Sequence, residues 1–200
     1  MPIPARSARQ PLSLKAYALG LLGQREHSEL ELRRKLQRHL RSVAQRAALA
    51  EQAAQAAQGV AGAGTPATVE SPDDPAAADA ARIDDTIAWL RAHKYLSDAR
   101  FVESRIHARA ARYGNQRIRQ ELAQHGLELD ETTRQALKDS EMERAQAVWQ
   151  RKFGAPAGDA GGRARQARFL AQRGFSPELV VRLLRSVQRG STDTDDPELD

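Results

Sequence analysis

The fold is decided by GNQRIRQELAQHGL (residues 114–127), which returns as GRARQARFLAQRGF (residues 162–175). The two copies align without gaps at an offset of 48 residues, and the matched pairs are Gly114 with Gly162, Leu122 with Leu170, Gly126 with Gly174 and Leu127 with Phe175. A fainter copy, SELELRRKLQRHL (residues 28–40), places Leu36 at the position of Leu122. A helical pattern with this period predicts a repeat protein, and such proteins usually offer a partner an extended surface instead of a catalytic pocket.

The composition favours a helical protein without disulfides. Aromatic residues make up only 4% of the 200 residues, and the abundance of Ala, Arg, Leu, Glu and Gln is typical of helices. The absence of cysteine excludes disulfides and thiolate chemistry. The sequence shows no apolar run near the roughly 18 residues that cross a membrane, and no signal peptide. We therefore expect a cytoplasmic protein.

The net charge of +5 is unevenly distributed. Residues 191–200 carry five acidic side chains and no basic one, which leaves a net charge of +10 on the rest of the chain. A basic body suits an anionic partner such as nucleic acid. It is equally consistent with a solvated surface in a protein that prefers arginine over lysine.

The sequence pattern in the first part of the chain predicts helices that are interrupted by an insertion. Leu40 stands where the later copies have a glycine that would end the helix, so we expect this helix to continue through the Ala-rich residues 44–58. The Gly- and Pro-rich residues 59–75 predict a disordered break. Helix is expected to resume near Ala81, and residues 41–80 together resemble an insertion into the first repeat.

Capping signals and apolar spacing divide the chain into about nine helices in three groups of three, each in the order long, short, short. Ser28 with Glu31 forms a capping box, the signature of a helix start. The other expected boundaries are a start at Leu14, an N-cap at Ser97, a break at Gly114, an end at Gly126, a start at Asp130, and helices over 141–153, 163–173 and 177–187 with a loop at 154–162.

Motifs for catalysis or metal binding are missing from the sequence. The five histidines are scattered without metal-ligand spacing, and no nucleotide-binding or nucleophile motif is present. Glu121 and His125 lie one turn apart, but a solvated helix face explains them better than a metal site does. Gly161–Gly162 precedes a helix and could bind a phosphate, although a flexible connector is the simpler interpretation. We expect no catalytic residue, metal or cofactor.

The segment 100–119 is the most basic part of the chain, with six arginines and one acid. Arg105, Arg109 and Arg112 follow i, i+4, i+7 spacing, which predicts a helical stripe that could track phosphates. Tyr113 could stack on a ligand or pack in the core, and a solvated face remains an alternative for the arginines. Trp149 and Phe153 are expected in the core.

The sequence resembles a known family, the RecX regulatory proteins, which modulate the RecA recombinase. The resemblance rests on KYLSDARF (residues 94–101) and RYGNQRIRQELAQHGL (residues 112–127). The first helix pair (residues 14–40) and RFLAQRGFSPELV (residues 168–180) also fit, so that about three-quarters of the chain is covered. Leu40 in place of glycine, the insertion and the acidic tail depart from the family pattern.

The resemblance implies an all-α fold of three tandem three-helix repeats in an elongated, curved array. The expected division is a disordered N-terminus (1–11), a first repeat (12–96) with a partly disordered insertion (41–80), a second repeat (97–139), a third repeat (140–189) and a disordered acidic tail (190–200).

The resemblance also implies a non-enzymatic, monomeric regulator. It would bind RecA and the RecA filament on single-stranded DNA, in the helical groove, and inhibit recombinase, ATPase and co-protease activity, thereby modulating DNA repair and the SOS response. Single- and double-stranded DNA are further candidate partners.

The expected anion-facing residues are Arg105, Arg109, Arg112, Arg117 and Arg119. Charge reversal at Arg105 and Arg109 should weaken filament binding while the helical circular dichroism persists. The alternative is a general nucleic-acid-binding helical protein without RecA specificity; a nuclease or hydrolase would need clustered acids, which the sequence does not show.

Overall fold

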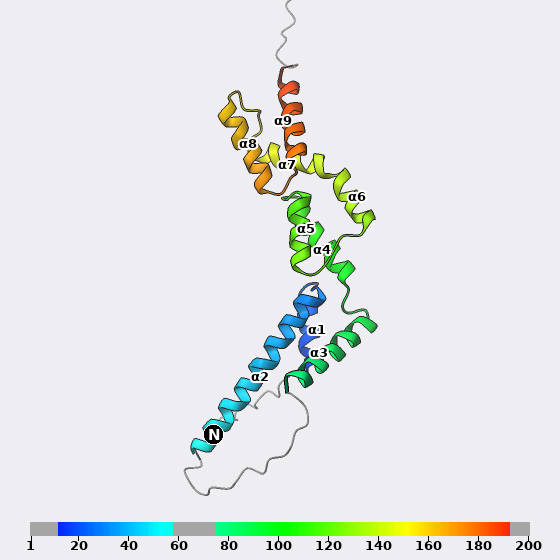
Figure 1. The fold of residues 1–200 in the computed structure, drawn as a ribbon, viewed down its shortest axis with the longest axis vertical. Coiled ribbons are helices and arrows are strands. Elements are labelled where there is room, and N and C mark those ends of the chain that lie inside the picture. Colours follow the sequence, from blue (N-terminus) through cyan, green and yellow to red (C-terminus); the bar gives the residue numbers. More distant parts are fainter. Residues whose placement is uncertain (1–11, 58–74, 193–200) are drawn as a thin grey trace, which may run out of the picture. The chain divides into compact units, whose positions relative to one another are not determined.

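The computed structural model describes residues 12–57 and 75–192, and within these ranges every regular element is an α-helix (Figure 1). The described helices are α1 (Leu14–Leu22), α2 (Glu29–Ala57), α3 (Pro75–Ala92), α4 (Asp98–Ala110), α5 (Asn115–Gln124), α6 (Glu131–Asp139), α7 (Glu141–Lys152), α8 (Ala160–Gln172) and α9 (Pro177–Thr192). The chain divides into two compact units, Met1–Asp98 (unit 1) and Ala99–Asp200 (unit 2).

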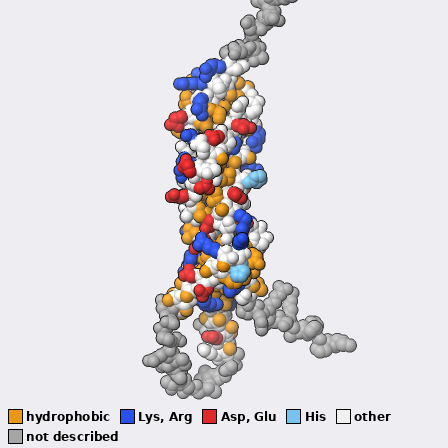
Figure 2. Space-filling view, turned by 90° about the vertical axis from the view of Figure 1, so that its right-hand side faces the viewer, with side chains coloured by type: hydrophobic (Ala, Val, Ile, Leu, Met, Phe, Trp, Pro, Cys, Tyr) orange, Lys and Arg blue, Asp and Glu red, His pale blue; other side chains and the backbone are white. Residues whose placement is uncertain are grey.

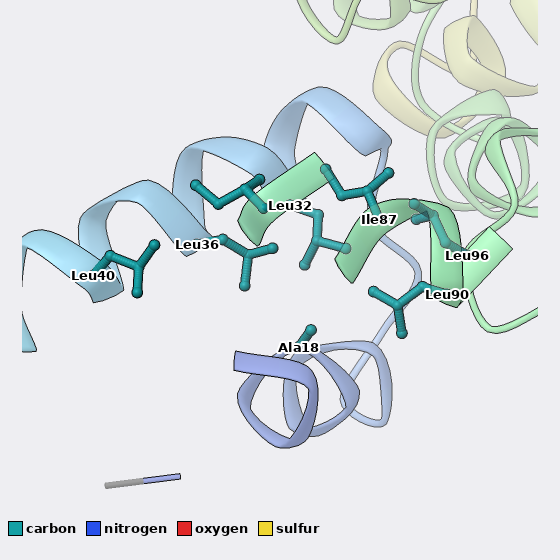
Figure 3. Packing of buried hydrophobic residues seen from close by; sticks show 8 residues of the cluster. Ala18, Leu32, Leu36, Leu40, Ile87, Leu90 and Leu96 are labelled. Atoms are coloured by element: carbon teal, nitrogen blue, oxygen red, sulfur yellow. The ribbon is translucent and has the colours of Figure 1, made fainter. Parts of the chain in front are cut away.

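Unit 1 contains α1, α2 and α3, which pack around one apolar core (Figure 3). Leu32, Leu36 and Leu40 recur at four-residue spacing on α2, and this spacing puts them on the face that meets α1 and α3. Ile87 and Leu90 of α3 complete the layer from the opposite side. The apolar face that the sequence predicts for this helix is therefore the buried one.

The turn between α1 and α2 is fixed by side-chain capping. The backbone N–H of Glu31 donates to Ser28 Oγ at 3.2 Å, as the capping box predicts. The Glu31 carboxylate itself is engaged by Arg25, which lies before the helix. Ser28 is fully buried, so its hydroxyl satisfies a helix-end amide where water has little access.

The helix α2 continues past Leu40 to Ala57, as the lack of a glycine at that position predicts. The side chains of residues 44–56 are all exposed, and Leu49 is 58% exposed. This half of α2 therefore buries no described side chain in a core, and its high content of alanine accounts for its helicity. The expected break at 59–75 and the expected disordered ends (1–11 and 190–200) lie almost entirely outside the described residues.

Unit 2 contains two apolar clusters, each built from three consecutive helices. The first joins α4, α5 and α6, and its buried members are Phe101, Ile118, Leu122, Leu129 and Leu137. The second joins α7, α8 and α9, and its buried members are Ala145, Val148, Trp149, Leu170, Phe175, Leu179, Val180 and Leu183. The repeat-matched residues Leu122 and Leu170 are thus equivalent core positions of two successive three-helix groups.

Some expected boundaries are wrong. Helix α3 begins at Pro75 and not near Ala81, so the last residues of the supposed insertion belong to it. Gly161–Gly162 lies in the first turn of α8 and not in a connector, because Asp159 caps the helix one turn earlier than expected by accepting a hydrogen bond from the Gly162 amide. The order long, short, short holds for α4–α6 only, since α2 and α9 are the longest helices of their groups. The division into repeats at 12–96, 97–139 and 140–189 stays a prediction.

Candidate anion-binding groove in unit 2

Charge alone does not locate a binding site on this protein. Figure 2 shows one face, on which basic side chains are interspersed with acidic ones. Many arginines in the described residues are neutralised locally; Arg33, for example, pairs with Asp84 at 2.5 Å and with Glu29 at 3.3 Å. A better criterion for an anion site is a group of cations that share a concave surface and lack a carboxylate partner.

Two glycines join the helical groups of unit 2 by direct backbone contact. The Gly114 amide donates to the carbonyl of Arg173 at 2.9 Å, and the Gln116 amide donates to the carbonyl of Gly174 at 3.1 Å. The amides at the N-terminus of α5 therefore donate to the carbonyls at the end of α8. The positive end of one helix dipole thus faces the negative end of the other. A Cβ on Gly114 would lie 2.2 Å from the Gly174 oxygen, so the approach requires glycine.

A polar cluster completes this joint from α7. Glu141, which is 7% exposed, accepts the Asn115 amide at 2.8 Å, so that a third N-terminal amide of α5 is satisfied. Arg144 donates to the carbonyls of Tyr113 at 3.0 Å and Leu137 at 2.9 Å, and to Asn115 Oδ1 at 2.6 Å. Burial lowers the pKa of the Arg144 guanidinium, and the helix-end carbonyls around it compensate for the lost water.

This joint forms one wall of a groove of about 380 Å³ between the turn after α4, helix α7 and the C-terminal part of α8. Its lining residues are Ala111, Arg112, Tyr113, Val148, Arg151, Lys152, Phe169 and Arg173. Four of them are cations, and within the described residues none of the four has a carboxylate in ion-pair distance. In the part of the chain that the structure describes, the only hydrogen bond from any of these four side chains is the weak donation from Arg151 to the carbonyl of Ala111 at 3.3 Å. The groove therefore concentrates positive charge that no described acid offsets.

Aromatic rings lie among these cations. The guanidinium of Arg173 sits 3.8 Å from the centroid of Phe169, whose ring meets Phe153 edge to face at 5.0 Å. Arg117 lies 4.5 Å from the centroid of Tyr113 and so adjoins the groove through that ring. Rings and guanidinium planes that alternate along a concave surface can accept both phosphates and the flat faces of bases.

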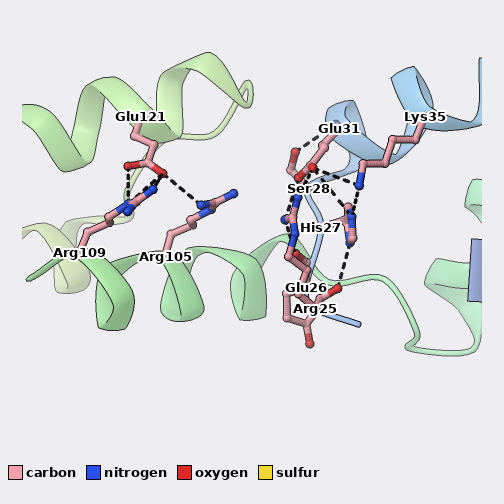
Figure 4. Close-up of polar contacts among 9 residues, drawn as sticks. All are labelled: Arg25, Glu26, His27, Ser28, Glu31, Lys35, Arg105, Arg109 and Glu121. Carbon is pink, nitrogen blue, oxygen red and sulfur yellow. Dashed lines mark hydrogen bonds and ion pairs between the residues drawn. The ribbon is translucent and has the colours of Figure 1, made fainter. Parts of the chain in front are cut away.

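The five arginines predicted to face an anion lie in different surroundings, and the three that were expected to form a stripe do not share one helix. Arg105 and Arg109 both donate to the carboxylate of Glu121, at 3.2 Å and 2.9 Å (Figure 4). Hydrogen bonding and the charge of Glu121 raise the pKa of Arg109. These two arginines therefore hold α4 against α5 and carry less free charge than the sequence suggests.

Arg112 is not on the helical stripe, because α4 ends at Ala110. It lies in the following turn and lines the groove, while Arg117 adjoins it through Tyr113. Arg119 lies elsewhere, in a hollow of about 420 Å³ that is also lined by Arg134, by the acidic Glu128 and by leucines of α5 and the following loop. The structure thus brings two of the five predicted residues to one surface.

Four residues that line the groove are not among those predicted from the sequence to bind: Arg151, Lys152, Phe169 and Arg173. A signal was available for Arg173, because it directly precedes the repeat glycine Gly174 and the joint places that corner beside Tyr113. The pair Arg151 and Lys152 follows the core residues Val148 and Trp149 by one turn, where a helix face changes from buried to exposed. Trp149 is in the core, as expected, whereas Phe153 is only partly buried and packs against that core.

The expected lack of a metal site remains an expectation, but Glu121 and His125 have other contacts. Glu121 is engaged by arginines, and the ring of His125 lies against Phe101 at 4.9 Å. The described residues contain no group of three or more potential metal ligands. Nor is any helix within them both long and apolar enough to span a bilayer.

Helices grouped in threes, joined through glycine contacts and bearing a cationic groove, define a modular helical protein of tandem three-helix domains. Residues 97–137 match the model of the RecX second three-helix domain, and residues 139–184 match that of the third. The chain belongs to the RecX family of regulatory proteins. The predicted resemblance and the prediction of an all-helical chain of tandem three-helix domains are thereby confirmed.

Curated relatives agree over nearly the whole chain. The regulatory protein RecX of Ralstonia nicotianae is 40% identical over 191 residues, which cover 94% of this chain and 97% of the relative. The protein of the same name from Leptothrix cholodnii is 41% identical over 181 residues, which cover 90% and 92%. The one from Herbaspirillum seropedicae is 39% identical over 191 residues, which cover 94% and 98%.

Proposed function

We propose that this protein is a non-enzymatic regulator that binds RecA and its filament on single-stranded DNA, and that it inhibits recombinase, ATPase and co-protease activity. Membership of a family named as regulatory proteins supports a regulatory role, and the resemblance implies RecA as the partner. The activity would take place in the cytoplasm and modulate DNA repair and the SOS response. The protein would act as a monomer.

The observation that carries the proposal is the groove with its four unpaired cations. A nucleoprotein filament is a repeating anionic lattice, so a groove of this kind would contact phosphates or acidic side chains at several successive protomers. Many weak contacts add up when they are linked on one scaffold. Such a ligand changes the filament only if it favours one conformational state over another, and contacts that span protomers provide that difference.

Within this proposal Arg112 lines the groove, Arg117 adjoins it through Tyr113, and Arg105, Arg109 and Arg119 are anion-facing residues outside it. Arg105 and Arg109 make an ambiguous test, because reversing their charge would put new acids beside Glu121 and would loosen α4 from α5. Arg112 and Lys152 have no described ion pair to lose, so their removal tests binding more directly.

The test is the rate of single-stranded-DNA-dependent ATP hydrolysis by RecA, titrated with this protein at near-physiological salt. The wild type should inhibit well below one molecule per RecA protomer. The double variant Arg112→Ala/Lys152→Ala should need about tenfold more protein for the same inhibition. The matched control Arg165→Ala/Arg168→Ala removes two exposed cations of α8 outside the groove and should inhibit like the wild type. Wild-type protein without any effect on RecA would refute the proposal.

General nucleic-acid binding without RecA specificity is the second candidate, and the same groove favours it. Cations interspersed with rings suit a sugar–phosphate backbone whatever protein is bound to it. This alternative predicts equal affinity for naked DNA and for RecA filaments, together with a steep dependence on salt. Fluorescence anisotropy of labelled DNA, with and without RecA, separates the two candidates.

A further inference from the structure

Unit 1 carries an aromatic surface that the proposed function does not use. Trp89 of α3, His93 and Tyr95 bring three rings together just after the helix ends. The ring centroids of Trp89 and His93 are 4.3 Å apart, those of Trp89 and Tyr95 are 5.6 Å apart, and those of His93 and Tyr95 are 6.4 Å apart. The angles between the ring planes are only 30°, 25° and 8°. The rings are therefore nearly parallel.

The backbone builds this arrangement. Lys94 has a positive φ of 60°, which reverses the chain and brings Tyr95 back beside Trp89. The Tyr95 amide donates to the carbonyl of Leu90 at 2.9 Å, and Nδ1 of His93 donates to the carbonyl of Trp89 at 2.8 Å. The His93 ring is thus held by its own hydrogen bond, and the backbone of Tyr95 is fixed at the end of α3, so that a ligand meets preorganised faces.

The rings are accessible although Trp89 also supports the core. Trp89 is half-buried and packs against the leucines of unit 1, whereas His93 is exposed and Tyr95 is 48% exposed. Rings that served only the apolar core would be buried, and a helix end that was merely solvated would have no reason to carry three adjacent rings. Their exposure indicates a surface that accepts another flat group.

The cations beside the rings indicate which flat group fits. Lys15 places its ammonium 5.0 Å from the centroid of Trp89, and Lys94 lies between His93 and Tyr95 in the chain. Neither lysine has a carboxylate within ion-pair distance among the described residues, whereas the nearby Arg91 is held by Glu29 and Asp98. Ring faces, an ammonium over one of them and a second, exposed lysine between the other two in the chain match unpaired bases joined by phosphates.

We propose that Trp89, His93 and Tyr95, together with Lys15 and Lys94, form a base-stacking site for single-stranded nucleic acid on unit 1. A base stacks on the exposed rings of His93 and Tyr95 and so extends the array that begins at Trp89. The lysines contact the adjoining phosphates. The site stands on contacts within unit 1 alone, and it does not depend on whether RecA is the protein's partner.

The test uses the intrinsic fluorescence of the full-length protein. Of the two tryptophans, Trp149 is buried at 3% exposure and donates its indole N–H to Gln166, so Trp89 is the one that a bound base can quench. An oligothymidylate should quench the emission, and an abasic oligonucleotide of the same length should not, because it offers the same phosphates without bases. The variant Trp89→Phe should lose the response to oligothymidylate.

A pair of alanine variants provides the second measurement. Tyr95→Ala should bind oligothymidylate about tenfold more weakly and should bind the abasic strand unchanged. Val181→Ala is the matched control, since Val181 is also 48% exposed but lies in unit 2, and it should bind like the wild type. Circular dichroism confirms that each variant is folded. Equal quenching by the two strands, or unchanged oligothymidylate affinity in folded Tyr95→Ala, would overturn the proposal.

Discussion

His27 shows how one buried residue organises the turn between α1 and α2 (Figure 4). Its side chain is 1% exposed; Nδ1 donates to the carbonyl of Arg25 at 2.9 Å, and Nε2 accepts from Nζ of Lys35 at 2.8 Å. These partners require a neutral ring with its proton on Nδ1. A second proton would point at the ammonium of Lys35, and the nearby Glu31 carboxylate, 3.8 Å from Nε2, is already engaged by Arg25.

We predict that the stability of unit 1 falls as the pH drops below 6.5. Burial lowers the pKa of His27 below its ordinary value of 6.5, so the unfolded chain binds the proton first and the folded state loses free energy relative to it. Denaturant unfolding between about pH 8 and about pH 5 measures this loss. The variant His27→Gln should remove most of the pH dependence, and His93→Gln, at an exposed position, should keep it. Identical pH profiles in the two variants would contradict the assignment.

Lys94 is the one described non-glycine residue with a positive φ. It ends α3 in the way that Gly174 ends α8: the Lys94 amide donates to Arg91 and the next amide to Leu90, as Gly174 donates to Ala171 and Phe175 to Leu170. A side chain in this left-handed conformation crowds the following carbonyl, which glycine avoids.

The substitution Lys94→Gly should therefore raise the free energy of unfolding by about 1 kcal/mol. The control Ala88→Gly, at an exposed position inside α3, should lower it by about the same amount because glycine weakens a helix interior. Denaturant titration followed by circular dichroism measures both changes. A destabilised Lys94→Gly protein would show that the lysine side chain contributes more than its strained backbone costs.

At the level of helices, we derive a prediction from the end-to-end contact of α8 with α5. Gly114→Ala should destabilise unit 2 by about 2 kcal/mol, since its Cβ would meet the backbone of Gly174 and Phe175 within 2.4 Å. Gly174→Ala should act similarly, because its φ of 81° and its contact with Arg117 both exclude a side chain. Gly20→Ala, where no atom lies within 4 Å, should stabilise α1 instead. Thermal unfolding of the three variants distinguishes a tight joint from an incidental one.

The sequence predicts helices better than it predicts how they join. Apolar spacing, the capping box at Ser28 and the glycines at 126 and 174 are local signals, and the helix ends near them are confirmed. The joint depends on contacts that Glu141 and Arg144 make with residues 110–115, which lie 26 to 34 residues earlier in the chain. Local sequence patterns cannot show such contacts. Of the residues that line the groove, only Arg112 and Tyr113 could therefore be proposed from the sequence.

The predicted arginine stripe failed for a related reason. Helical spacing placed Arg105, Arg109 and Arg112 on one face, but spacing does not reveal a carboxylate that arrives from another helix. Glu121 of α5 takes up two of the three guanidinium groups, and the helix ends before the third. Net charge in a segment therefore overstates the charge available to a ligand.

For the whole molecule, the groove should account for part of the salt dependence of binding to single-stranded DNA. Each phosphate that a cation neutralises adds about −0.7 to the slope of log affinity against log salt concentration. Replacing Arg112, Arg151, Lys152 and Arg173 by alanine should thus make the slope shallower by about 3. Anisotropy titrations at four or five salt concentrations measure it. An unchanged slope in a folded quadruple variant would show that the DNA contacts lie elsewhere.

The contact between Gly114 and Gly174 also limits how the protein can recover from mutation. At most tight contacts, a second substitution in the same chain can relieve the clash, because a larger residue on one side is tolerated once its neighbour becomes smaller. At Gly114 this repair is closed, because an added Cβ would meet only backbone atoms, those of Gly174 and Phe175, and Gly174 is already the smallest residue. A suppressor of Gly114→Ala must therefore shift a helix, and genetic screens should find it in the packing residues of α5 or α8, never at Gly174.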